Sequence, residues 1–176
     1  MKKIYTHLFS TPRFSLTVLL ALLCFVSARA QTTTLRINEF LALNQTGLTD
    51  EDGEFSDWIE IYNPTSQPVN LQGWSLTDDT TTPTKWLFPD IIIEADGYLV
   101  IYASGKDRAK TTANLHTNFK LSGSGEYLAL YNTGGVAASS FSPTFPAQSN
   151  DVSYGFYESG YMSFTFPTPG LSNGTS

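Results

Sequence analysis

The chain has 176 residues, of which 16 are acidic and 10 are basic, and it contains a single cysteine, Cys24. Four of the basic residues but none of the acidic ones lie within the first 30 positions, so residues 31–176 carry six basic and 16 acidic side chains, a net charge of −10. Such a surface repels nucleic-acid phosphates, and one cysteine provides neither an internal disulfide nor a cysteine zinc site.

The start of the chain has the three parts of a secretory signal peptide. Lys2, Lys3 and Arg13 form a basic region, residues 14–26 form an uncharged apolar run, and residues 28–30 read Ala-Arg-Ala, the pattern of a cleavage site. The apolar run has 13 residues, fewer than the roughly 20 that span a bilayer. We therefore expect this segment to be removed, and the remainder to be secreted or held at the cell surface without membrane insertion.

Removal of residues 1–30 leaves residues 31–176, a normal length for one domain. Short runs in this part alternate apolar and polar residues at period two, between clusters of Gly, Pro, Asn, Asp and Ser. The candidate strands are 35–43, 58–62, 69–71, 74–76, 86–88, 91–93, 98–103, 116–120, 127–131, 136–141 and 152–156. Because the connections are too short for crossover helices, we expect an all-β fold, a two-sheet antiparallel β-sandwich of about eight or nine strands without a disulfide.

An acidic loop precedes the second candidate strand. Asp50, Asp52, Glu54 and Asp57 place carboxylates close together, and Gly53 allows the loop to curl. Oxygen ligands of this kind suit Ca²⁺, although the spacing departs from an EF-hand, which needs a glycine at the sixth position and a glutamate at the twelfth. The alternative is a set of solvated charges that oppose edge-to-edge association of sheets. We keep the four acids as a candidate calcium site.

The motif DWIEIYNP gives the clearest strand signal. In an extended segment, Ile59 and Ile61 point to one side of the sheet, and we expect that side to be the core. The opposite side carries Trp58, Glu60 and Tyr62. The Asn-Pro pair that follows ends the strand.

Three tryptophans are expected to replace a disulfide in holding the sheets together. Trp58, Trp74 and Trp86 all lie in or beside candidate strands, and each side chain can bury roughly 150–250 Å². Of the three, we expect Trp74 to be the most completely buried.

Three tyrosines follow one local pattern on three candidate strands. Tyr62, Tyr102 and Tyr131 each come directly after the second of two core-facing aliphatic residues, so they point away from the core. On neighbouring strands they would form a ladder that stacks against a sugar or a peptide, because a tyrosine ring has an apolar face and a hydroxyl. The alternative is cross-strand aromatic pairing that stabilises a sheet. We keep them as candidate ligand-binding residues.

Six motifs occur in order along the chain. They are INEF at 37–40, DWIEIYNP at 57–64, LQGWSLTDD at 71–79, FPDIIIEADGYLVIYAS at 88–104, LHTNFKLSGSGEYLALYN at 115–132 and PTPGLSN at 167–173. Together they resemble the lamin tail domain family. The resemblance implies an immunoglobulin-like, non-enzymatic β-sandwich, and bacterial members of the family are commonly exported modules of adhesion, targeting or assembly. The chain lacks a coiled-coil rod and a nuclear localisation run, so a nuclear or filament role is not expected.

Enzymatic function has little support in the sequence. His116 is the one histidine after the signal peptide, and no G-x-S-x-G motif surrounds Ser124. We therefore expect no catalytic or cofactor-binding residues, with Ca²⁺ as the one candidate cofactor. The favoured function is an exported, non-catalytic module that binds a protein or polysaccharide at the cell surface. The alternatives are a structural spacer separated from a larger secreted protein and, less favoured, a carboxylate-based hydrolase.

Overall fold

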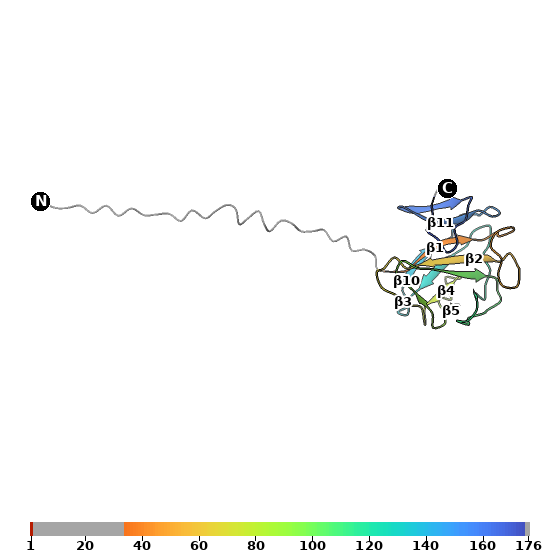
Figure 1. The fold of residues 1–176 in the computed structure, drawn as a ribbon, viewed down its shortest axis with the longest axis horizontal. Helices are drawn as coiled ribbons and strands as arrows, with labels where there is room; N and C mark the ends of the chain where they lie inside the picture. Colours follow the sequence, from red (N-terminus) through yellow and green to blue (C-terminus); the bar gives the residue numbers. More distant parts are fainter. Residues whose placement is uncertain (2–33, 175–176) are drawn as a thin grey trace. The chain divides into compact units, whose positions relative to one another are not determined.

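The computed structural model describes Met1 and residues 34–174, and the description below is confined to them (Figure 1). The predicted signal peptide, apart from Met1, lies outside these residues. The described chain contains twelve strands and no helix, so it also contains no helix that could cross a membrane. The strands are β1 (Arg36–Leu41), β2 (Asp57–Tyr62), β3 (Val69–Asn70), β4 (Ser75–Thr77), β5 (Trp86–Leu87), β6 (Ile92–Ile93), β7 (Tyr98–Ala103), β8 (Leu115–His116), β9 (Leu128–Tyr131), β10 (Ala137–Phe141), β11 (Ser153–Tyr157) and β12 (Gly160–Phe164).

Two main sheets form the sandwich. One has six strands in the order β12-β11-β1-β2-β7-β8, the other has four in the order β10-β9-β4-β5, and β3 pairs with β6 separately. In Figure 1, β11 (blue) lies beside β1 (orange), although the two strands are more than 100 residues apart in the sequence. The predicted all-β sandwich is confirmed. It differs from the prediction in having twelve strands, several of only two residues, and one parallel pair, β7 with β8.

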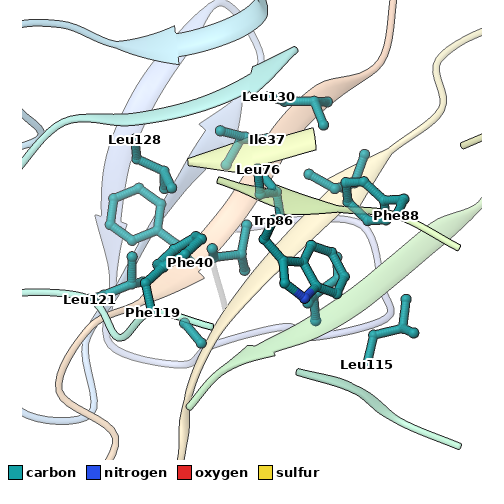
Figure 2. Close-up of a cluster of buried hydrophobic side chains, with 14 of the residues drawn as sticks. Ile37, Phe40, Leu76, Trp86, Phe88, Leu115, Phe119, Leu121, Leu128 and Leu130 are labelled. Atoms are coloured by element: carbon teal, nitrogen blue, oxygen red, sulfur yellow. The ribbon is translucent and has the colours of Figure 1, made fainter. Parts of the chain in front are cut away.

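The core lies between the two sheets and is built from the alternating apolar positions of the strands. Ile59 and Ile61 both have 0% exposure and lie in this core, as their spacing predicts. Figure 2 shows side chains from β1 (Ile37, Phe40), β4 (Leu76) and β9 (Leu128, Leu130) in one cluster with Trp86 and Phe88. The two rings meet edge to face with their centroids 4.9 Å apart, a favoured aromatic geometry.

The prediction for the tryptophans is wrong in one respect. Trp58 and Trp86 are 1% and 2% exposed, whereas Trp74 is only partly buried. Trp74 comes directly before β4, where the chain leaves a turn, and it packs against the margin of the core. Trp58 lies on the other side of the six-stranded sheet, in a small separate cluster with Leu41 and Tyr102. The sheet is therefore covered on both sides, which the alternation along β2 does not reveal.

Candidate functional site

We define the outer face as the side of the six-stranded sheet that points away from the four-stranded sheet. Trp58, Glu60 and Tyr62 lie on this face, since they alternate along β2 with the isoleucines of the core. The segment after β12, residues 165–173, crosses this face and is hydrogen-bonded to it. The outer face thus has a covered centre at Glu60 and two ends, one at Trp58 and one at Tyr62.

Two carboxylates occupy the covered centre. Glu39 on β1 lies opposite Glu60 on β2, and both residues have 0% exposure. Glu39 accepts hydrogen bonds from the backbone N–H and the hydroxyl of Thr168 at 2.9–3.2 Å. Glu60 accepts one from Nδ2 of Asn38 at 2.8 Å and another from the backbone N–H of Gly170. The two acids therefore hold the segment that follows β12 against the sheet.

The environment of Glu60 makes its carboxyl group a weak acid. Burial raises the pKa of Glu60 to about 7, which the adjacent Glu39 reinforces and the hydrogen bonds from Gly170 and Asn38 oppose. Glycoside hydrolases use a carboxyl of raised pKa beside a second acid. Here neither carboxyl has exposed surface, so no sugar contacts them while the segment is in place. The pair acts as a clamp in this conformation.

A cavity of about 260 Å³ lies at the Trp58 end of the outer face. Its base is apolar and includes Leu41 and Trp58, both 1% exposed. Pro167 and Pro169, from the clamped segment, form part of its wall. The remaining lining residues are Thr46, Gly47, Leu48, Asp151 and Thr165.

The polar part of this cavity is fixed by hydrogen bonds. Oδ1 of Asp151 accepts from the backbone N–H groups of Gln45 and Thr46 at 2.7 and 2.9 Å, and Oδ2 accepts from the Thr46 hydroxyl at 2.8 Å. These bonds favour the ionised form, so the pKa of Asp151 lies below its usual value. An apolar base beside ordered polar groups is the usual composition of a ligand site.

A stack of planar groups lies at the Tyr62 end. The rings of Tyr62 and Tyr98, opposite each other on β2 and β7, stack with centroids 4.7 Å apart. The guanidinium carbon of Arg36 lies 4.8 Å from the Tyr62 centroid and 4.1 Å from that of Phe156. Both distances are within the range of cation–π attraction. A tyrosine stack therefore exists, but only Tyr62 of its two tyrosines is among the three predicted.

The structure does not bring the three predicted tyrosines together. Tyr102 lies opposite Trp58, is 6% exposed, and donates its hydroxyl to the Thr49 carbonyl at 2.8 Å. Tyr131 belongs to β9 in the four-stranded sheet, where its hydroxyl lies 3.0 Å from that of Tyr127. Tyr62 alone of the three joins the stack, so the ladder does not form. A role of these tyrosines in ligand binding stays a prediction.

Three acids of the predicted calcium loop converge on one lysine. Nζ of Lys106, in the loop after β7, lies 2.6 Å from Asp50, 2.7 Å from Asp52 and 3.0 Å from Glu54. Asp50 also accepts hydrogen bonds from the backbone N–H groups of the other two acids and from the Ser56 hydroxyl. Burial alone would raise the pKa of Asp50, but these donors and the ammonium outweigh it and hold the pKa well below its usual range. Asp50 is thus the organising residue of the loop.

The fourth predicted acid has another environment. Asp57 begins β2 and accepts a hydrogen bond from the backbone N–H of Asn44 at 3.3 Å. Burial raises the pKa of Asp57 to about 6, whereas none of the ion pairs described above includes it. Asp57 therefore lies apart from the cluster around Lys106.

Glu51 connects the acidic loop to a buried histidine. Its two carboxylate oxygens lie 2.9–3.0 Å from Nε2 of His116, and Nδ1 of His116 lies 2.8 Å from the Ser104 hydroxyl. With the proton on Nε2, the ring donates to Glu51 and accepts from Ser104. Arg108 adds an ion pair to Glu51 at 2.7 Å, and hydrogen bonding by His116, the larger cause, and by Arg108 lowers the pKa of Glu51 to about 2. His116 and Ser104 are 0% and 9% exposed, so this chain of groups fastens the loop to the sheet.

A basic side chain already pairs with three of the four acids of the predicted calcium site. Among the described residues, no three histidine, aspartate or glutamate side chains form a group arranged to hold a metal ion. Lys106 and Arg108 already balance the loop acids, so a cation would have to displace them. Ca²⁺ binding stays a prediction. The sequence analysis identified the acids but not the basic residues that pair with them. The two basic residues of the KDR motif at 106–108 were the sequence feature that could have indicated this pairing.

Comparison with known proteins identifies the family. The family model described as Lamin Tail Domain matches residues 28–144. The chain belongs to the lamin tail domain family. This finding confirms the resemblance of the six motifs, and lamin tail domains are immunoglobulin-like modules of non-enzymatic character. A comparison with curated proteins found no match. The lamin tail domain match includes β1 to β10, whereas β11, β12 and the clamped segment follow it in the sequence.

Proposed function

We propose that this protein is an exported, non-catalytic lamin tail domain that binds a protein or polysaccharide at the cell surface. The observation that carries the proposal is the cavity at the Trp58 end of the outer face, about 260 Å³ in volume. Its volume is close to the lower limit of typical small-ligand sites, roughly 300 Å³, and suits one sugar unit or one side chain of a larger partner.

The composition of the cavity supports binding rather than catalysis. Five of the nine described lining residues are apolar, namely Leu41, Leu48, Trp58 and the two prolines, and Asp151 is the one ionisable residue among the nine. General acid–base chemistry usually needs two titratable groups facing the substrate. The buried pair on the same face, Glu39 and Glu60, is covered by the segment after β12.

Binding can be tested with a substitution that fills the cavity. Thr165 is exposed and lines the opening, so Thr165→Arg places a long side chain there without disturbing the core. Thr111→Arg is the matched control, since Thr111 is exposed and does not line the cavity. Glycan arrays and pulldowns from isolated cell envelopes should show a ligand that the control retains and Thr165→Arg loses. Absence of any ligand would instead favour a structural spacer.

Export rests on the signal-peptide pattern of the first 30 residues. Expression in a host with a general secretory pathway should deliver the protein outside the cytoplasm. Its intact mass should correspond to a chain that begins at Gln31. A secreted or envelope-bound protein that retains the first 30 residues, or a protein found only in the cytoplasm, would contradict this part of the proposal.

A further inference from the structure

Arg36 is held rigidly on the outer face. Its guanidinium lies between the rings of Tyr62 and Phe156, at 4.8 and 4.1 Å from their centroids. Its Nε donates a hydrogen bond to Oδ1 of Asn38 at 3.2 Å. Both faces of the guanidinium and its Nε edge are thereby occupied. The N–H groups at the other edge remain as the donors available to a ligand.

Arg36 also lacks an acidic partner, in a chain that is rich in acids. Among the described residues, Lys85, Lys106 and Arg108 each form an ion pair within 4.0 Å. No carboxylate in the described part of the chain lies that close to Arg36, Lys110 or Lys120, and of these three only Arg36 is partly buried. Burial lowers the pKa of Arg36, and nearby tyrosines oppose that effect, yet a guanidinium keeps its charge in proteins. A half-buried, immobilised and unpaired cation is costly unless something pairs with it.

We infer that the free edge of Arg36 binds the carboxylate of an acidic sugar unit, and that Tyr98 contacts the adjoining sugar of the same polysaccharide. A planar guanidinium edge matches a carboxylate through two parallel N–H···O hydrogen bonds. Tyr98 ends the stack: it is partly exposed, and among the described residues its one aromatic neighbour is Tyr62. We therefore place the apolar side of the sugar against the other face of its ring. This inference rests on the proposed binding function and names its ligand class as uronate-containing polysaccharide.

Because the protein is negatively charged overall, binding of an acidic polysaccharide should depend strongly on Arg36. Residues 31–176 carry a net charge of −10, which opposes the approach of a polyanion. A local interaction at Arg36 must overcome that repulsion. Loss of the guanidinium should consequently weaken binding far more than loss of an exposed positive charge elsewhere.

The test compares two polymers with the same sugar backbone, one with carboxylates and one with neutral methyl esters. Polygalacturonate presents a carboxylate on every sugar, and its fully methyl-esterified form presents none. We expect the purified protein to bind polygalacturonate and not the ester in affinity electrophoresis at low ionic strength. Arg36→Gln should weaken binding about tenfold or more, as expected for the loss of charge-assisted hydrogen bonds. Lys110→Gln removes an equal charge from an exposed site and should change binding less than about twofold.

Each result decides a different question. Equal binding of both polymers, or polygalacturonate binding that Arg36→Gln leaves unchanged, would overturn the role of Arg36. Preference for single-stranded DNA over polygalacturonate would overturn the ligand class. Binding of a neutral glycan or a protein that Thr165→Arg abolishes would leave the proposed function standing without this inference, whereas absence of all binding removes both. The comparison of the two polymers uses the unsubstituted protein, so it stands even if Arg36→Gln fails to fold.

Discussion

Glu39 and Glu60 lie opposite each other on adjacent central strands, with no exposed surface on either residue. Two acids so placed are stable only if donors surround them and one takes up a proton. The segment after β12 supplies donors through Thr168 and Gly170. The stability of the clamp is therefore coupled to pH.

The first prediction concerns that coupling. The pKa of Glu60 is about 7 in the folded protein against an ordinary value of 4.5, so the folded state favours the protonated acid. The stabilisation that Glu60 provides to the folded state is complete below pH 4.5 and is lost as the pH rises through about 7. Loss of roughly 3 kcal/mol follows from about 1.4 kcal/mol per pKa unit. Asp57, whose pKa is also raised, is present in both proteins, so urea unfolding between pH 4 and 8 should show a larger loss of stability in wild type than in Glu60→Gln; parallel profiles would contradict it.

The second prediction concerns Lys106. Its ammonium lies 2.6 Å from Asp50, whose side chain is fully buried. Lys106→Met should destabilise the protein by about 2–4 kcal/mol at pH 7, because it leaves a buried charge without its partner. The folded-state pKa of Asp50 is depressed, so this stabilisation is present above the ordinary pKa of 3.8 and fades as the pH falls through the folded value. The exposed Lys110, replaced by Met, provides the control, and equal effects of the two substitutions would refute the prediction.

The third prediction separates two tryptophans. Trp58→Ala should cost about 3–5 kcal/mol, since the side chain is enclosed and its removal leaves a cavity. Trp74→Ala should cost less, because Trp74 is only partly buried at the margin of the core. Chemical denaturation of both variants measures the difference. A larger loss for Trp74→Ala would show that the margin contributes more than its burial implies.

The fourth prediction uses a glycine beneath the clamp. A Cβ on Gly155 would lie 2.6 Å from Nδ2 of Asn173 and 3.0 Å from Cγ of Glu39. Gly155→Ala should therefore destabilise the protein by about 1–3 kcal/mol through overpacking. Gly160→Ala is the matched control, since no atom lies within 4 Å of its added Cβ. Similar melting temperatures for the two variants would show that the segment after β12 can shift to accommodate the added methyl group without loss of stability.

The fifth prediction tests calcium at the acidic loop. If Ca²⁺ binds to Asp50, Asp52 and Glu54, it competes with Lys106 for the same oxygens. Calorimetric titration should then show tighter binding to Lys106→Met than to wild type, with a matching rise in melting temperature. Neither heat nor stabilisation at millimolar Ca²⁺ in both proteins would remove the calcium hypothesis.

Local sequence patterns predicted much of the fold. Alternation in DWIEIY placed Ile59 and Ile61 in the core, and the turn residues separated most strands correctly. The prediction missed β12 because the sequence GYMSF does not alternate regularly between apolar and polar residues. Most of the strand is also exposed. The two-residue strands β3, β5 and β6 lie within the candidate ranges 69–71, 86–88 and 91–93, but the expected total of eight or nine strands was too low. These differences concern strand number and leave the sandwich itself as predicted.

The candidate site was harder to predict because it depends on contacts between distant segments. The pairing of β2 with β7 brings Tyr98, not Tyr102, opposite Tyr62, and register cannot be read from single strands. Tyr131 joins the other sheet for the same reason. Lys106 meets Asp50 across more than 50 residues of chain. Composition indicated an acidic loop, but only the fold shows which charges it meets.

The matched family segment ends at residue 144, yet the clamp and part of the cavity wall come from residues after it. Anyone who transplants this domain into a fusion protein should consequently carry it through Asn173. A graft cut at the family boundary would lose β11 and β12 from the six-stranded sheet, present Glu39 and Glu60 to water and open the cavity at Trp58 on one side. The segment needed for an intact domain therefore extends beyond the segment that the family model matches.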